Sequence, residues 1–273
     1  MRRRMINIAG PEWFSSAPSR EAGSPGRPWA RRVGRAGTSL AAGLLLLVLT
    51  ASACGGGGES SQPEQAGGII DPADYAATVD HPLVPLSSIR LTVFQGSERD
   101  AETGETVETR VESRVSEKSE LVAGVEVTAV EVNEYEGDEL VERTTDYYAQ
   151  QPDGSVSYMG ERVENYEDGE ISGHEGQWLA GEGGAMPGLF MPAEPKLGQT
   201  FEQERAPGVA EDRSTVVAVG LDVTTPAGTF ADCIKTEDFA PLDNTTGFKY
   251  YCSGVGLVRE EFPGGGLDLV RYR

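Results

Sequence analysis

Three cysteines and two histidines are the side chains of this chain best suited to covalent, redox or metal chemistry. Nucleophilic hydrolysis needs a serine with a base beside it, but the chain contains no G-x-S-x-G. The segment HEGQW around His174 lacks the second histidine of a zinc-protease helix, and His81 lies far from it in the sequence. We therefore predict no catalytic residue, no metal and no cofactor, and expect that the protein is not an enzyme.

Cys54 follows a segment with the features of an export signal. A basic stretch over 31–35 precedes an uncharged run over 40–53, which is too short to span a membrane as a helix. The small residues that end this run directly before Cys54 resemble the lipobox of bacterial lipoproteins. That resemblance implies a diacylglycerol thioether on Cys54 and cleavage just before it. Ordinary secretory cleavage after the ASA of 51–53 is the alternative, and it leaves Cys54 free.

The leader and a tether define the predicted domain organisation. Residues 1–53 are the leader and signal peptide, and the length and lack of periodicity of 1–30 suggest that translation starts downstream of them. Residues 54–68 are rich in glycine and serine and are expected to be a flexible tether. Residues 69–273 are long enough for one extracytoplasmic domain. We expect this domain to lie at the outer face of the cytoplasmic membrane.

Cys233 and Cys252 are the remaining cysteines, and an exported protein meets an oxidising compartment. They lie in two strand-like runs that a turn-rich segment separates, so a cross-strand disulfide is the expected arrangement. A redox-active pair is the alternative, but the two cysteines lack C-x-x-C spacing and a nearby cation.

The charge balance limits the partners of the chain. Eight basic and two acidic residues precede Cys54, so the rest carries 15 basic and 42 acidic residues, a net charge of −27. This charge repels nucleic acid and anionic headgroups, and membrane association is therefore expected to come from the lipid on Cys54. Among so many carboxylates no catalytic pair or calcium loop stands out. The segments 133–139 and 165–170 are better explained as hairpin tips.

The periodicity of the mature chain is that of β-strands. Apolar residues alternate with charged ones over 88–96 and 106–115, and the alternation over 122–132 slips near Ala129, which indicates a bulge. Turn signals follow at 136–138, 153–154 and 168–169. We predict an all-β fold of about ten to twelve strands with little helix. It would be a strongly curved antiparallel meander or a half or closed barrel.

The segment 177–198 breaks this pattern with glycine and proline. It holds the apolar residues that we select as a candidate ligand or docking site: Trp178, Leu179, Met186, Leu189, Phe190 and Met191. Three functions stay open for it. It is a plug at one end of a barrel, a lid over an apolar ligand, or a contact surface for another protein.

Several stretches resemble a family of bacterial lipoproteins without an assigned function. They are DYYAQQPDGSVSYMGE (146–161), MPAEPKLG (191–198) and FKYYCSGVGLVRE (248–260), against family patterns such as DWYAQD-GNVWYFGE, PGI-MPA-P--G and KYY--GVG. The resemblance covers about 88–273, and it implies a β-rich envelope domain with no catalytic residues to carry over. The architecture is more distantly similar to the half-barrels of the lipoprotein carriers LolA and LolB.

Two functions of different kinds are compatible with these features. The first is a lipid-anchored binding module that holds an apolar or amphiphilic ligand in the concave face of its sheet. The second is an envelope interaction protein with a self-plugged barrel, and a hydrolase ranks behind both. An empty apolar cavity inside the sheet would favour the first, and a filled core would favour the second.

Overall fold

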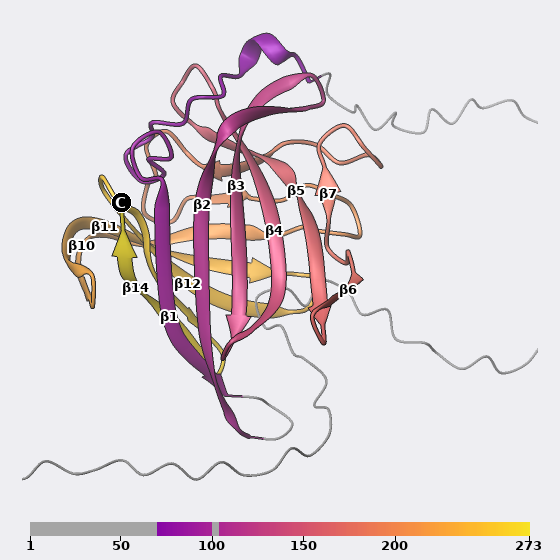
Figure 1. The fold of residues 1–273 in the computed structure, drawn as a ribbon. Helices are drawn as coiled ribbons and strands as arrows, with labels where there is room; N and C mark the ends of the chain where they lie inside the picture. The colour runs from indigo at the N-terminus through magenta and orange to yellow at the C-terminus, as the bar shows by residue number, and fades with distance from the viewer. Residues whose placement is uncertain (1–69, 100–103) are drawn as a thin grey trace, which may run out of the picture.

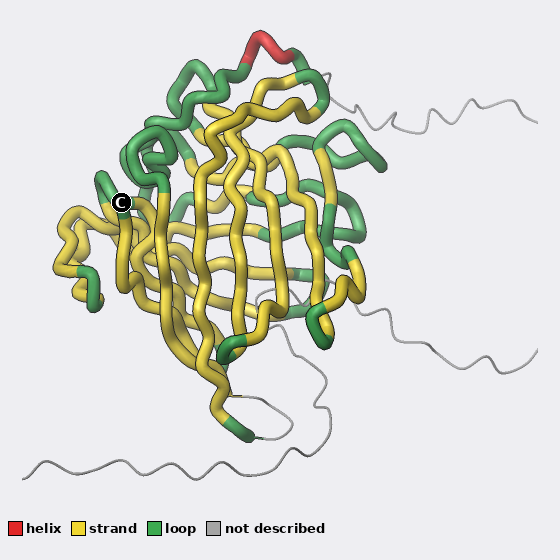
Figure 2. The backbone as a smooth tube through the Cα atoms, in the orientation of Figure 1, coloured by secondary structure: helices red, strands yellow, loops and turns green. Residues whose placement is uncertain are grey.

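The computed structural model describes residues 70–99 and 104–273, and most of this part of the chain is β-strand (Figures 1 and 2). Fourteen strands form one antiparallel sheet. They are β1 (Leu91–Arg99), β2 (Thr106–Val122), β3 (Val125–Glu136), β4 (Glu139–Gln150), β5 (Val156–Glu167), β6 (Glu170–Gly173), β7 (Trp178–Leu179), β8 (Gly188–Met191), β9 (Thr200–Glu202), β10 (Arg213–Thr225), β11 (Gly228–Ala240), β12 (Thr245–Cys252), β13 (Gly256–Phe262) and β14 (Gly265–Tyr272). A short 3-10 helix, Pro72–Asp74, precedes them. The described residues include no helix that is long and apolar enough to cross a membrane.

The strands follow one another across the sheet almost in sequence order. The order is β6-β5-β4-β3-β2-β1-β14-β13-β12-β11-β10-β9, and β7 and β8 pair with β5 beside this path. The predicted curved antiparallel meander is confirmed, and it is an open sheet rather than a closed barrel. The predicted number of strands is too low because β7 and β8 are too short to show an alternating pattern.

Turns lie at the predicted tips and reverse the chain between β3 and β4, β4 and β5, and β5 and β6. Gly154, Asp168 and Gly169 have φ angles of +95°, +52° and +79°. Glycine adopts this left-handed backbone readily and aspartate tolerates it, which explains why Asp-Gly pairs mark tight hairpins.

A bulge bends β2 where the alternation of β3 slips. Val115 and Ser119 of β2 pair with residues only two positions apart on β3, so 116–118 lie opposite Ala129. The bulge predicted near Ala129 is therefore confirmed, and its extra residues belong to the partner strand. Such bulges increase the local twist and bend of a strand.

The sheet folds over so that its two halves face each other. In Figure 1, β2–β5 run in front, and the strands of the C-terminal half cross behind them at a steep angle. One hydrophobic cluster joins Val130 and Tyr158 of the first half to Val216 and Ile234 of the second. This arrangement is that of two sheets packed orthogonally, with the bend made by strands that continue from one half into the other.

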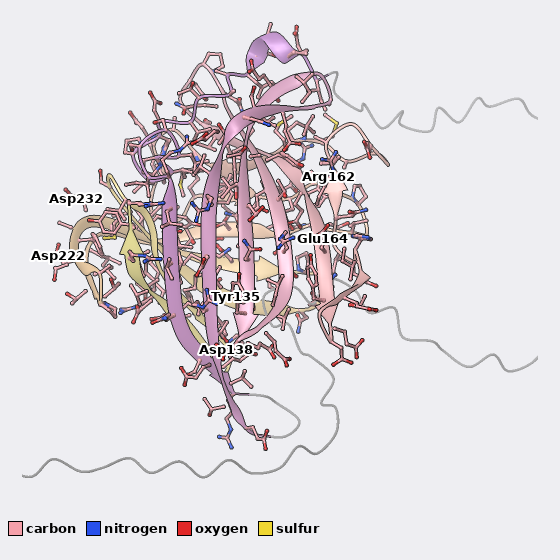
Figure 3. The ribbon with its side chains drawn as sticks, in the orientation of Figure 1. Tyr135, Asp138, Arg162, Glu164, Asp222 and Asp232 are labelled. Atoms are coloured by element: carbon pink, nitrogen blue, oxygen red, sulfur yellow. A yellow bond between two sulfur atoms is a disulfide. The ribbon has the colours of Figure 1, made fainter. Side chains whose placement is uncertain are left out.

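The outer face of the N-terminal half carries the charged side chains that the alternation predicts. Tyr135, Arg162 and Glu164 stand on this face in Figure 3. Arg162 donates a hydrogen bond of 2.8 Å to the Tyr147 hydroxyl, and Arg143 lies 3.6 Å from a carboxylate oxygen of Glu164. Exposed pairs of this kind add little stability, so the core must hold the two halves together.

Candidate functional site

The segment 177–198 lies along β5 and forms β7 and β8 there. Trp178 pairs with Glu161, and Met191 with Val156. All six of its selected apolar side chains are buried or half-buried: Trp178, Leu179, Met186, Leu189, Phe190 and Met191. Their burial places them in the wall between the two halves of the sheet.

Aromatic rings connect this segment to both halves. The Phe190 ring lies 4.9 Å from that of Tyr148 on β4 and 6.3 Å from that of Tyr251 on β12, measured between centroids. Trp178 meets Tyr158 of β5 edge to face at 5.5 Å. These separations are typical of stabilising aromatic pairs.

β8 also lies against the other edge of the sheet. The Met186 amide donates to the Arg205 carbonyl at 3.0 Å, and the Gln203 side chain donates to the Phe190 carbonyl at 3.4 Å. A Cβ atom on Gly188 would lie only 1.9 Å from the Gln203 carbonyl oxygen, so the two backbones approach as closely as glycine allows. The segment thus spans part of the opening between β5 and β9.

Four buried carboxylates line the inner face of β3–β5. Glu134 is directly opposite Glu142, and Asp146 is directly opposite Glu161. Each of the four residues is between 2% and 7% exposed. Residues paired across antiparallel strands project to the same face, so these carboxylates gather on one wall. Asp146 and Glu161 are the first and last residues of the DYYAQQPDGSVSYMGE stretch, but that stretch did not mark them as members of a site.

Tyr158 connects two of these carboxylates. Its hydroxyl oxygen lies 2.7 Å from Asp146 Oδ1 and 3.0 Å from Glu161 Oε2. Trp178 projects beside Glu161, and its buried Nε1 has no hydrogen-bond partner among the described residues. A buried indole N–H usually has a partner, so this donor is unusual.

A second polar wall faces the first from β10–β13. The Lys249 Nζ lies 3.3 Å from Asp238 Oδ2, and the Ser214 hydroxyl donates to Asp238 Oδ1 at 2.6 Å. Thr236 is directly opposite Lys249 and fully buried, and its hydroxyl oxygen has no hydrogen-bond partner in the described part of the chain.

The two walls share one electrostatic environment. Burial, together with the charges of Asp238 and Asp243, raises the pKa of Asp212 to about 6. Glu161 of the first wall acts on Asp212 in the same direction, whereas Lys249 lowers its pKa. We call the group that these interactions connect the interior polar cluster. It consists of Asp146, Tyr158, Glu161, Asp212, Thr236, Asp238, Lys249 and Glu260.

Burial also raises the pKa of Glu260. For Lys249, burial opposes the charged form, but the nearby carboxylates of Asp238 and Glu260 outweigh it, and its pKa is raised. The Lys249 side chain still keeps 34% of its surface exposed, and that of Asp238 keeps 12%, so water reaches the cluster. Carboxylates held together in this way can bind a cation or a hydrogen-bonding polar group. The described residues contain no group of three His, Cys, Asp or Glu positioned to hold a metal ion.

The two histidines lie elsewhere. His81 is buried, accepts a hydrogen bond from the Leu83 amide at Nδ1, and its Nε2 lies 3.1 Å from the Pro192 carbonyl. Burial lowers its pKa, so the neutral ring ties the N-terminal segment to the end of 177–198. An open pocket of about 600 Å³ adjoins it. The Nδ1 of His174 lies 2.6 Å from the Val163 carbonyl.

The predicted disulfide is confirmed. Cys233 of β11 and Cys252 of β12 are directly opposite each other and bonded, with a Cα–Cα distance of 4.0 Å. Both are fully buried in a second hydrophobic cluster, which includes Phe94 and Leu269. Cys54, the predicted lipid attachment site, lies outside the described residues, as do the leader and the tether.

Comparisons with known proteins add little to this geometry. No protein-family profile matches the chain, and no curated protein matches it. Its structure is similar to that of a candidate lipoprotein from Parabacteroides distasonis, with 13% identity and a TM-score of 0.36. The match covers 72% of this chain and 100% of the other. The resemblance to a lipoprotein family and to LolA and LolB therefore stays a prediction from the sequence.

Proposed function

We propose that the chain is a lipoprotein of the bacterial cell envelope, held at the outer face of the cytoplasmic membrane through Cys54. We propose further that its sheet is a non-catalytic binding module for a small amphiphilic ligand with a cationic headgroup. The leader, the small residues before Cys54 and the glycine-rich segment after it support the anchor. The interior polar cluster and the aromatic rings beside it support the binding module.

The main observation in favour of a bound ligand is a pair of buried polar groups in the interior that lack hydrogen-bond partners. Trp178 Nε1 is a donor and the Thr236 hydroxyl is a donor and an acceptor, and neither has a partner among the described residues. Leaving a buried polar group without a partner costs about 1–3 kcal/mol, so such groups mark places where a ligand or water completes the structure. Both side chains project beside members of the interior polar cluster.

The chemistry of the two walls indicates the ligand class. The charge of Asp238 raises the pKa of both Asp212 and Glu260 against the opposing effect of Lys249, and a bound cation would further relieve this repulsion. On the facing wall, the rings of Tyr158 and Trp178 lie next to the carboxylates of Asp146 and Glu161 and can hold an apolar tail or the face of a cation. A small amine that has an apolar part and also a hydrogen-bond acceptor for the Trp178 N–H would satisfy both walls.

Docking through 177–198 is less well supported. Trp178 and Met191, which would be the strongest anchors of a protein contact, are 6% and 0% exposed. We therefore interpret the segment as a wall of the binding module.

The anchor is tested by metabolic labelling with a fatty-acid analogue in a bacterium that expresses the full chain. We expect a labelled protein in the membrane fraction, and an unlabelled, released protein when Cys54 is replaced by alanine. Equal labelling of the two proteins would contradict the anchor without bearing on the ligand.

The ligand is tested by native mass spectrometry of the Cys54→Ala protein, purified without detergent. We expect a bound mass that solvent extraction removes. Thr236→Val removes the hydroxyl at nearly constant volume, and Trp178→Phe removes the indole N–H together with part of the ring. Each should lower ligand occupancy by about tenfold. Thr215→Val is the matched control, because its hydroxyl bonds Thr200 on an exposed face. A bare mass in every preparation would rule out a tightly bound ligand.

A further inference from the structure

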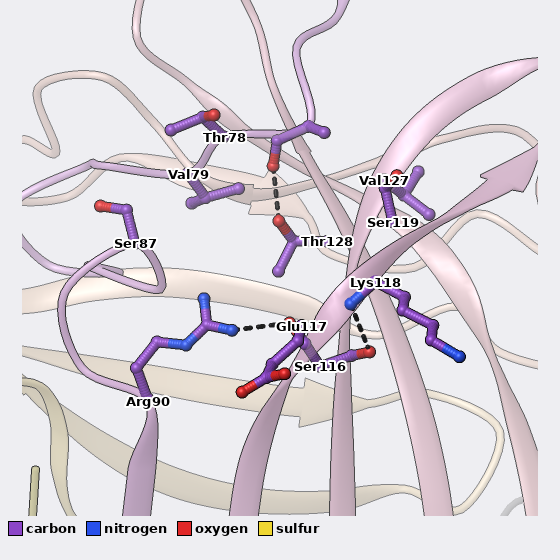
Figure 4. Close-up of a pocket in the computed structure, with 11 residues that line it drawn as sticks. Thr78, Val79, Ser87, Arg90, Ser116, Glu117, Lys118, Ser119, Val127 and Thr128 are labelled. Carbon is purple, nitrogen blue, oxygen red and sulfur yellow. Dashed lines mark hydrogen bonds between the residues drawn. The ribbon is translucent and has the colours of Figure 1, made fainter.

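A second site lies outside the interior, where the bulge of β2 meets the N-terminal segment. It is an open pocket of about 310 Å³ lined by Thr78, Ser87, Arg90, Ser116, Glu117 and Ser119, among others (Figure 4). Two contacts shape it. The Thr128 hydroxyl donates to the Ala77 carbonyl at 2.5 Å, and the Ser87 amide donates to the Val79 carbonyl at 2.9 Å. These bonds hold the N-terminal segment across the bulge and leave the pocket between them.

Arg90 is the fixed cation of this pocket. Its Nη2 donates to the Ser116 carbonyl at 2.7 Å and to the Val115 carbonyl at 3.4 Å, both at the start of the bulge. These are its side-chain bonds in the described part of the chain, where no carboxylate forms an ion pair with it. The planar guanidinium therefore has N–H groups left for a ligand, in a mature chain where acidic residues greatly outnumber basic ones.

Hydroxyl groups surround this cation. Ser116 Oγ accepts a bond from the Lys118 amide at 3.1 Å, which leaves its own O–H free to donate. Ser87, Ser119 and Thr78 add further exposed hydroxyls to the lining. An arginine with several hydroxyl donors is the donor set that suits an oxyanion, and phosphate above all.

Glu117 is the one residue of the lining whose charge opposes the binding of an anion. Its carboxylate also lines the pocket, and the residue is exposed on the bulge. A negative charge there weakens the attraction for an anion without blocking the pocket, because an exposed side chain can turn to solvent. Removing the charge of Glu117 should therefore tighten anion binding, whereas removing the charge of Arg90 should weaken it.

We propose that this pocket binds a phosphate group through Arg90 and the hydroxyls of Ser87, Ser116 and Ser119. The site is separate from the interior polar cluster and does not depend on the proposed ligand there. The phosphate group can belong to a free phosphate compound or to a lipid headgroup of the membrane.

The test uses the full chain with Cys54→Ala, which cannot carry an acyl anchor. Inorganic phosphate is titrated into the labelled protein at low ionic strength, and amide shifts of 116–119 are followed by NMR. Sedimentation with phosphatidylglycerol vesicles, against phosphatidylcholine vesicles, is measured in parallel. Saturable shifts with free phosphate identify a soluble ligand, and vesicle binding with only weak phosphate shifts identifies a headgroup.

Three variants decide the outcome. Arg90→Met should weaken binding at least about tenfold, and Glu117→Gln should tighten it about threefold. Ser88→Ala is the matched control, because the Ser88 hydroxyl bonds the Pro85 carbonyl instead of lining the pocket. If Arg90→Met fails to fold, Ser87→Ala combined with Ser119→Ala replaces it, with an expected loss of about fivefold. The proposal is overturned if neither phosphate nor the vesicles bind. It is also overturned if Glu117→Gln and Arg90→Met, or the double serine variant in place of Arg90→Met, bind as tightly as the Ser88→Ala control.

Discussion

At the residue scale, the interior shows why identical residue types do different things. Glu142 and Asp146 of β4 point inward and are buried, whereas the carboxylate of Glu164 on β5 points outward and lies 3.6 Å from Arg143. A strand reverses the direction of its side chains at every residue, so the sheet register decides which carboxylates lose their water. The loss of water raises the pKa of a buried carboxyl, as it does for Asp212.

The raised pKa of Asp212 predicts a dependence of stability on pH. The pKa of Asp212 is about 6 in the folded protein, against 3.8 for an ordinary aspartate such as that of the unfolded chain, so the folded state binds the proton more tightly. The stabilisation of the folded state by the tighter proton binding of Asp212 is complete below about pH 4 and is lost as the pH rises through 6. Asp212→Asn keeps a neutral side chain, and at pH 8 it should be more stable than wild type by about 1–3 kcal/mol. Urea denaturation at pH 4, 6 and 8 measures the difference.

Asp222→Asn is the control for this experiment, because it removes the same charge from an exposed position on β10 (Figure 3). The difference between Asp212→Asn and wild type should grow with pH, and that of the control should stay nearly constant. Parallel curves for the two variants would show that Asp212 is not the group responsible.

At the element scale, the segment 177–198 is where sequence and structure differ most. The sequence shows the apolar residues of this segment but not the strands β7 and β8, because two to four residues cannot display an alternating pattern. What places them is the backbone of β5 and β9. Gly160 and Gly188 leave no room for a Cβ atom against Trp178 and Gln203. The sequence shows the glycines but not which backbone each must approach.

Gly188→Ala should separate β8 from β9. The added Cβ would meet the Gln203 carbonyl at 1.9 Å, which backbone atoms can relieve only by moving apart. We expect a loss of about 1–3 kcal/mol in the free energy of unfolding. The Met186 amide, which bonds the Arg205 carbonyl, should also exchange its hydrogen faster.

Gly183→Ala controls for the loss of a glycine in the same segment. A Cβ there meets nothing within 4 Å, although its φ of +58° makes alanine unfavourable by about 1 kcal/mol. This variant should leave the exchange of the Met186 amide unchanged. Equal exchange in both variants would mean that β8 is not held by its contact with β9.

At the scale of the whole molecule, the sequence predicted the class of fold and its meander, the hairpin tips and the disulfide. Those features depend on residues close in sequence or on the small number of cysteines. The interior polar cluster could not be predicted, because it depends on how the two halves cross. Asp238 comes beside Asp212 through the pairing of β10 with β11, whereas Glu161 of β5 becomes its neighbour only after the sheet folds over. With 42 acids in the mature chain, composition could not select them.

The disulfide should contribute measurably to the stability of the whole sheet. It joins residues 19 positions apart, and a loop of this size restricts the unfolded chain by about 3 kcal/mol. Replacing Cys233 and Cys252 together with alanine should lower the free energy of unfolding by about 2–4 kcal/mol in urea denaturation. Wild-type protein under reducing conditions should lose a similar amount. A double variant as stable as the oxidised wild type would contradict this estimate.

The pairing of β1 with β14 determines when the sheet can be completed. Within the described residues, every other strand pair joins segments nearby in sequence, whereas this pair joins the first strand to the last. Next to it, the Arg273 carbonyl accepts hydrogen bonds from the Arg90 and Leu91 amides. A chain that emerges from a ribosome or a translocation channel with its N-terminus first can form its local hairpins early. The hydrogen bonds between β1 and β14 can form only once this last strand, of eight residues, is free. A chain truncated before β14 would therefore keep its hairpins and the contact of 177–198 with β5, but it would lose the pairing that joins β1 to the C-terminal half.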